Sequence, residues 1–271
     1  MSESYVISEI EKEYILSLLE QNRRVDGRGR LEHRPLEIET NVVEKAEGSA
    51  IVSLGKTKLI VGIKATLGAP FPDSPDSGVI TTGAELSPVA SPYFESGPPD
   101  DDAIELARVT DRAIRESHCI DLSKLCIVPG KWVWILFIDI YVLNHDGNLF
   151  DAATLGAIAA LATTKIPKVK VNDDEEPEIL EEREPLKIDH YPVSVTAYKI
   201  GKHTMVDANI KEERICDARL TFAYDEDEHI VAAQKGKAGV FTPDEVLTIA
   251  QESLEASKSL RKELFKALGK Q

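Results

Sequence analysis

The sequence predicts an α+β protein built from two successive units, each a group of strands followed by helix. Short β-rich segments come first and an Ala-rich or amphipathic helical segment follows them, and this order occurs twice along the 271 residues. Regular alternation of strands and helices is missing, which argues against a doubly wound parallel sheet. An acidic segment closed by prolines, residues 171–185, separates the two units.

The first unit opens with a helix and a turn. Apolar residues at helical spacing, from Val6 to Leu19, predict a helix over residues 8–21. Residues 23–30 then predict a turn, because Asp26-Gly27 disfavours regular structure. Alternating or β-branched residues predict strands at Pro35–Glu39, Gly48–Leu54, Lys58–Lys64 and, inside a loop rich in Pro, Gly, Ser and Asp, near Gly78–Leu86.

In the rest of the first unit, a helix precedes a long strand in the sequence and another helix follows it. The run Asp100-Asp101-Asp102 comes just before a helix predicted over about residues 103–118, and Asp suits the N-cap and the positive end of the helix dipole. Residues 124–144 predict strand interrupted at Pro129-Gly130, and residues 145–148 predict a turn. The small residues of Asp151–Thr163 predict a helix that packs closely against a sheet.

The second unit repeats the order. Strands are predicted at Tyr191–Ile200, Thr204–Val206, Arg219–Tyr224 and Ile230–Lys235. Thr242-Pro243-Asp244-Glu245 predicts a capping box with proline in the first turn, and Gly269 ends the last helix. The resulting division is a helix and turn (1–30), a first subdomain (31–168), a solvated acidic linker (169–189) and a second subdomain with the C-terminal helix (190–271).

Charge and cysteine content limit the function classes. With 32 Lys plus Arg against 47 Asp plus Glu, the net charge is −15, so a chain-wide basic surface for nucleic acid is excluded. Nucleic-acid contact then needs a local patch or a partner. Three cysteines without a C-x-x-C pair predict no disulfide framework and a reducing cytoplasm. No apolar run approaches the roughly 20 residues that cross a bilayer, so no membrane contact is expected.

One basic stripe stands out in this acidic chain. Arg108, Arg112 and Arg115 follow one another at helical spacing and share one face of the predicted helix. Guanidinium groups bind phosphate bidentately, so the stripe is a candidate anion site. Local ion pairs are the alternative, because acidic residues lie three or four positions away at Glu105, Asp111 and Glu116. The pattern alone leaves both open.

Other chemistry has little support. Six residues lie between Gly48 and Gly55-Lys56-Thr57, whereas a phosphate loop has four between its glycines, and both flanks predict strand, which argues against a phosphate loop. The histidines and cysteines show no metal-ligand spacing, and no serine stands in a nucleophile-elbow context. The sequence therefore predicts neither a metal site nor a cofactor.

The order of several motifs resembles a known family. They are Arg24-Val25-Asp26-Gly27-Arg28 with Arg34-Pro35-Leu36, Gly48-Ser49-Ala50 with Leu54-Gly55-Lys56-Thr57, Gly97-Pro98-Pro99-Asp100 with the helix from Glu105 to Arg112, and Val142-Leu143-Asn144-His145-Asp146-Gly147-Asn148. Together they resemble the RNase PH family, and within it the non-catalytic branch found in the ring of the archaeal exosome. The resemblance runs from about residue 20 to the C-terminus.

The resemblance implies a fold and an assembly. The fold is the RNase PH fold of two sheet-and-helix subdomains, the first like domain 2 of ribosomal protein S5. The implied partners are a catalytic RNase-PH-like subunit, with which it forms three heterodimers in a hexameric ring, the S1-domain cap subunits above that ring, and RNA. The family reaction is phosphorolysis, in which inorganic phosphate attacks the 3′-terminal phosphodiester of RNA.

Departures from the family pattern argue against catalysis by this chain. Active members carry Gly-Gly-Ser/Thr-Arg where this sequence has Gly147-Asn148-Leu149-Phe150. Leu149 and Phe150 therefore mark a degenerate phosphate site, since neither can hold an anion. The family's acidic residue before the strand at 219–224 aligns with Arg219, although Asp217 stands two positions away and a strand could aim it to the same side.

The sequence therefore predicts a non-catalytic exosome subunit that structures the active site of its partner and contacts RNA. The resemblance assigns RNA contact to Arg108 and Arg112, leaves Arg115 to ion pairing, and gives no catalytic residue. Two rivals remain: an active phosphate-dependent 3′-to-5′ exoribonuclease, against which Leu149 and Phe150 argue, and an interaction protein without RNA contact.

Overall fold

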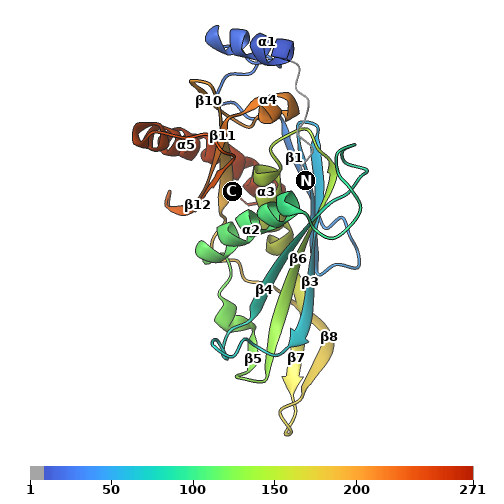
Figure 1. Ribbon diagram of the computed structural model, residues 1–271. Helices are drawn as coiled ribbons and strands as arrows, with labels where there is room; N and C mark the ends of the chain where they lie inside the picture. Colours follow the sequence, from blue (N-terminus) through green and yellow to red (C-terminus); the bar gives the residue numbers. More distant parts are fainter. Residues whose placement is uncertain (1–8, 271) are drawn as a thin grey trace.

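The computed structural model describes residues 9–270, which form two sheets around a central helix, with a hairpin at one end. Helix α1 (Glu9–Glu20) lies at the opposite end from that hairpin (Figure 1). Its Ile15 and Leu19 are buried beside Tyr198 and Met205 of the second sheet. The predicted helix over 8–21 is confirmed for the described residues, whereas Val6 and residue 8 lie outside them.

The first sheet has the strand order β1-β2-β3-β6-β4, with β5 paired to the outer end of β6. Its strands are β1 (Leu36–Thr40), β2 (Gly48–Leu54), β3 (Thr57–Gly68), β4 (Val79–Leu86), β5 (Cys126–Val128) and β6 (Trp132–Asn144). Every pairing is antiparallel except that of β4 with β6. Alternate residues of β2, β3 and β6 are buried, as the period of two predicts.

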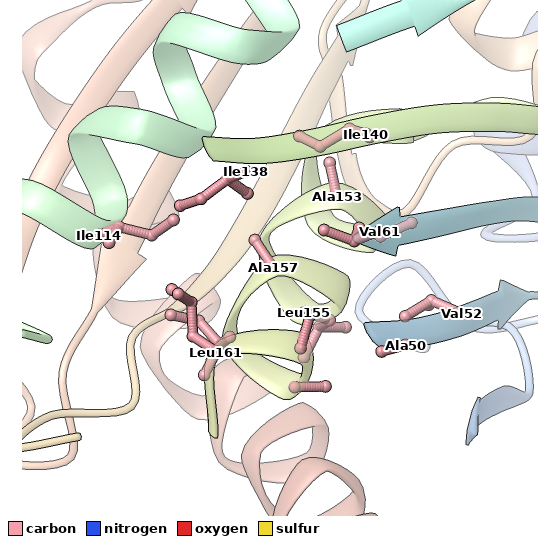
Figure 2. Close-up of a cluster of buried hydrophobic side chains, with 14 of the residues drawn as sticks. Ala50, Val52, Val61, Ile114, Ile138, Ile140, Ala153, Leu155, Ala157 and Leu161 are labelled. Carbon is pink, nitrogen blue, oxygen red and sulfur yellow. The ribbon is translucent and has the colours of Figure 1, made fainter. Parts of the chain in front are cut away.

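Helix α3 (Leu149–Ala162) is the centre of the molecule and contacts both β2 and β3 of the first sheet and β9 of the second. Its residues from Leu149 to Leu161 are all buried. Figure 2 shows Leu155 and Ala157 of this helix among Val52 and Val61 of the sheet. Small residues permit this close approach, since a Cβ on Gly156 would come within 2.8 Å of Val61.

The second sheet has the order β10-β9-β11-β12 and is antiparallel throughout. Its strands are β9 (Val193–Ile200), β10 (His203–Val206), β11 (Ala218–Tyr224) and β12 (Ile230–Gly236). Helix α5 (Pro243–Ala267) begins with the predicted capping box of Thr242 and Glu245. A short helix, α4 (Ile210–Ile215), was not predicted. One apolar core runs from β2 to α5, so the two units share it.

Helix α2 (Asp101–Glu116) packs on β4, α3 and β12. The side chain of Asp100 accepts a hydrogen bond from the backbone N–H of Ala103 at 2.8 Å, so an Asp caps the helix as predicted, but the helix begins at Asp101, two residues earlier than predicted. A 3₁₀ turn (Leu122–Leu125) leads from α2 towards β5. These contacts set α2 beside the beginning of α3, where the candidate site lies.

The acidic segment is a β-hairpin rather than an irregular linker, which corrects the prediction for residues 169–189. Strands β7 (Lys165–Val171) and β8 (Pro177–Pro185) pair antiparallel and extend from the body of the molecule (Figure 1). Lys168 of β7 offsets a carboxylate of β8, with its Nζ 2.7 Å from Glu182 Oε1. The predicted solvation holds, since β8 is almost entirely exposed.

None of the helices in residues 9–270 combines the length and the apolar character needed to span a bilayer.

Candidate functional site

The turn that precedes α3 is held by a buried ion pair between two distant segments. Asp207, which follows β10, accepts hydrogen bonds from Arg34 Nη2 at 2.7 Å and from the Arg34 backbone N–H at 2.7 Å. Arg34 also donates to the carbonyls of Asp146 and Gly147, at 2.6 and 3.1 Å. Burial opposes ionisation of Asp207, but the hydrogen bonds and charge of Arg34 outweigh it and lower its pKa to about 2.

Gly147 is required by the shape of this turn. Its φ is +88°, which favours glycine, and a Cβ there would lie 2.5 Å from the carbonyl oxygen of Ala208. Asn148 follows with φ of 52°, and its buried side chain donates to Asp151 and Asp207 at 2.7 and 2.8 Å. The turn is therefore fastened to the second sheet at several points.

The beginning of α3 carries an apolar pair and a carboxylate. Leu149 and Phe150 are 8% and 6% exposed. The backbone N–H of Asn148 donates to Glu213 Oε2 at 2.8 Å, so a carboxylate of α4 occupies the positive end of the helix dipole. A negative side chain of the protein thus already fills the place where a helix N-terminus attracts an anion.

Arg219 of β11 covers the other side of Phe150. Its guanidinium carbon lies 4.0 Å from the centre of the Phe150 ring, and Nη2 lies 2.6 Å from Glu105 Oε1 of α2. Gly236 of β12 leaves room for it, because a Cβ there would lie 2.5 Å from Arg219 Nη2. Arg219 therefore joins β11, α2 and the beginning of α3.

A cavity of about 150 Å³ lies beside Leu149 and Phe150. Its walls include as many acidic as basic side chains, namely Asp102, Glu105, Glu213, Arg214, Arg219 and Lys237. His145 stacks on Phe94 at a centroid distance of 5.3 Å, and burial lowers its pKa, which favours the neutral ring. Burial and the neighbouring carboxylates Asp100 and Glu105 raise the pKa of Asp102. These features do not form the cluster of positive groups that a phosphate dianion needs.

Asp217, the residue that the sequence offers as an alternative to Arg219 for the acidic position, lies away from the cavity. Its Oδ2 accepts a hydrogen bond from the backbone N–H of Gly201 at 2.7 Å, in the turn between β9 and β10. It is exposed and does not line the cavity. Its observed role is to hold that turn.

Among residues 9–270, one group of side chains has ligand atoms close enough to hold a metal ion. Single ligand atoms of Asp225, Asp227 and His229 lie within 4.8 Å of one another, between β11 and β12. None of the three lines the cavity. Their nearness alone assigns them no role.

The three arginines of α2 differ in their surroundings. Arg115 Nε pairs with Asp111 Oδ2 at 3.0 Å, as local pairing predicts. Arg108 and Arg112 are exposed, and neither forms a hydrogen bond or ion pair with any residue between 9 and 270. The expected partner of Arg108, Glu105, is bound to Arg219 instead.

Sequence reasoning missed the roles of Glu213, Glu105 and Asp207. Glu105 and Arg219 are 114 positions apart, so no local pattern links them. The sequence did single out Leu149 and Phe150, and the structure places both in the first turn of α3.

Comparison with known proteins identifies the family of the chain. Residues 32–167 match the 3′ exoribonuclease family, domain 1, and residues 190–256 match domain 2 of the same family. The chain belongs to the RNase PH family. The resemblance seen in the sequence and the predicted RNase PH fold are confirmed.

Relatives in this family align along the whole chain. The exosome complex component Rrp42 of Thermococcus kodakarensis is 55% identical over 271 residues, covering 100% of both chains. That of Methanopyrus kandleri is 48% identical over 242 residues, covering 89% of this chain and 90% of the relative.

Two solved structures contain chains with a similar fold. A chain of the Archaeoglobus fulgidus exosome with RNA bound to the active site has a TM-score of 0.87 and 46% identity, covering 94% of this chain and 98% of that one. A chain of an archaeal exosome core has a TM-score of 0.84 and 43% identity, covering 94% and 96%. Both support the fold over nearly the full length.

Proposed function

We propose that this chain is a non-catalytic ring subunit of an archaeal exosome, which binds RNA while a catalytic RNase-PH-like partner performs phosphorolysis. The full-length relatives named exosome complex component Rrp42, and the similar chains in archaeal exosome structures, support the assembly. In the proposed assembly three heterodimers form a hexameric ring in the cytoplasm, with S1-domain subunits as its cap. The chain would structure its partner's active site and contribute to RNA binding.

The observation that carries the non-catalytic role is the closed beginning of α3. Leu149 and Phe150 supply neither a hydroxyl nor a charge, and Glu213 accepts the hydrogen bond of the Asn148 N–H. A phosphate dianion brought to this point would meet a fixed carboxylate. Positioning and charge stabilisation carry most of the catalysis of phosphoryl transfer, so the loss of this anion site removes the chemistry.

The observation that supports RNA binding is the state of Arg108 and Arg112. Both guanidinium groups are exposed on α2 and have no acidic partner within the described residues. An unpaired, hydrated guanidinium can take a phosphate without first breaking an ion pair. In a chain of charge −15, these two cations form the kind of local patch that RNA contact requires.

RNA affinity of the assembled ring at several salt concentrations tests this assignment. Arg108→Ala and Arg112→Ala are compared with Arg115→Ala, which removes the same charge from the same helix but from an existing ion pair. Each phosphate contact contributes about −0.7 to the slope of log affinity against log salt on single strands. The first two variants should each lose up to about 0.7 of slope and Arg115→Ala much less. If Arg108→Ala and Arg112→Ala keep the wild-type salt slope, or lose no more of it than Arg115→Ala does, RNA contact by Arg108 and Arg112 is rejected.

The rival assignment is an exoribonuclease that acts without a partner. Two contacts count against it. The Glu213 carboxylate of α4 accepts the hydrogen bond of the Asn148 N–H at the beginning of α3, and Asp217 is bound to the Gly201 N–H. Activity of the isolated chain decides between the two.

A further inference from the structure

Glu105 has two arginines within reach and binds only one of them. Arg108 is three positions further along α2, a spacing at which a glutamate and an arginine share one helix face. In the structure Glu105 Oε1 instead accepts from Arg219 Nη2 at 2.6 Å, across the interface between α2 and β11. Gln234 Nε2 approaches the same oxygen at 3.5 Å. Glu105 therefore binds Arg219, which is distant in sequence, and not Arg108 on its own helix.

The surroundings of Arg219 explain why Glu105 binds it and not Arg108. Its side chain is 8% exposed, it stacks on Phe150, and the absence of a side chain at Gly236 provides its slot. A guanidinium fixed in this way loses little entropy when it binds a carboxylate, whereas exposed Arg108 must be ordered to do so. Burial also strengthens the Coulomb attraction relative to a pair in water.

We propose that Arg219 is a positioning residue for RNA binding: by engaging Glu105 it keeps that carboxylate away from Arg108 and leaves the Arg108 guanidinium free for an RNA phosphate. The inference rests on the proposed function. Without Arg219, Glu105 turns to Arg108, neutralises it and places a negative charge beside the RNA path. Arg219 thus acts through Glu105 and touches no RNA itself.

The test is an epistasis series in the assembled ring, with RNA affinity measured against salt. Arg219→Met keeps length and apolar contact with Phe150 but cannot bind Glu105. It should weaken RNA binding and lower the slope by up to about 0.7, the loss expected for Arg108→Ala. Adding Glu105→Gln to Arg219→Met should restore the slope, because no carboxylate then competes for Arg108. In a ring that already carries Arg108→Ala, adding Arg219→Met should lower neither the RNA affinity nor the salt slope any further.

Two controls separate this from nonspecific effects. Glu116→Gln removes a carboxylate of α2 that has no partner in the described chain, and it should not restore the Arg219→Met ring. Arg219→Lys keeps a cation for Glu105 and should bind RNA with nearly the wild-type slope. Ring integrity is matched by size-exclusion chromatography and thermal unfolding.

The outcomes are distinguishable. If Arg108→Ala leaves the salt slope unchanged, the proposed RNA contact of Arg108 fails. If Arg108→Ala lowers the slope but Arg219→Met does not, or Glu105→Gln fails to restore it, the positioning role of Arg219 is overturned while the RNA contact stands. Restoration by Glu116→Gln as well would also overturn it, since charge alone would then explain the recovery.

Discussion

Replacement of Asp207 by Asn tests how the turn before α3 is held. The Asp207 side chain is fully buried and accepts hydrogen bonds from Arg34, from Arg28 Nη1 at 2.8 Å and from Asn148 Nδ2 at 2.8 Å. Asn cannot neutralise the buried Arg34 guanidinium, which is 6% exposed. Removal of one partner from a buried ion pair costs about 3–5 kcal/mol, so the variant should lose that much free energy of unfolding at pH 7.

The pH dependence of this loss can be worked out. Burial disfavours the Asp207 charge, but Arg34 lowers the folded-state pKa from 3.8 to about 2. At about 1.4 kcal/mol per pKa unit, this shift contributes on the order of 2–3 kcal/mol above the unfolded-state pKa. Because the folded pKa is depressed, the contribution is present above pH 3.8 and disappears as pH falls towards 2. About half of it should remain at pH 3.

Urea unfolding of the wild type and Asp207→Asn at pH 7, 5 and 3 measures this difference. The gap in free energy of unfolding should be largest at pH 7 and clearly smaller at pH 3. Asp173→Asn, in the exposed hairpin, is the control and should change stability little at any pH. A gap that stays constant from pH 7 to pH 3, or one below about 1 kcal/mol at pH 7, would refute the reasoning.

Other predictions follow from the same structure. Gly147→Ala should destabilise the chain by about 1–3 kcal/mol in urea unfolding, because of its positive φ and the contact with Ala208, whereas Gly97→Ala, with open space around it, should have little effect. Leu149→Ser with Phe150→Arg should not create phosphorolysis, since Glu213 still occupies the beginning of α3; nucleoside diphosphate release at the partner's rate would contradict this. Limited digestion by a glutamate-specific protease should cut first at the hairpin tip, residues 172–176, and protection of that tip would count against its exposure.

Elements with a strong local signal were predictable. The capping box of Thr242 placed the start of α5, and the run Asp100-Asp101-Asp102 placed that of α2 to within two residues. Helix α4 has six residues, too few for a periodic pattern to identify it. The acidic composition of residues 169–189 predicts a linker, whereas the strand pairing and the Lys168–Glu182 pair that stabilise the β7–β8 hairpin depend on register.

The apolar pair at the beginning of α3 was predictable, but the contacts around it were not. Comparison of Leu149 and Phe150 with the family motif predicts a degenerate phosphate site, and both residues are buried at that point. The choice of Glu105 between Arg108 and Arg219 depends on the packing of α2 against β11, which helical spacing does not encode. The same holds for Glu213, which reaches the beginning of α3 from a helix that the sequence did not predict.

The most direct test of the central claim is phosphate-dependent RNA decay by the purified chain, by its catalytic RNase-PH-like partner and by their assembled ring. Each is incubated with a 3′-tailed RNA, inorganic phosphate and Mg²⁺, and nucleoside diphosphate release is measured. The account predicts no release above background from this chain alone, and RNA binding by the ring that weakens when Arg108 and Arg112 are replaced by Ala. Release by the isolated chain at a rate comparable to that of the ring would contradict it.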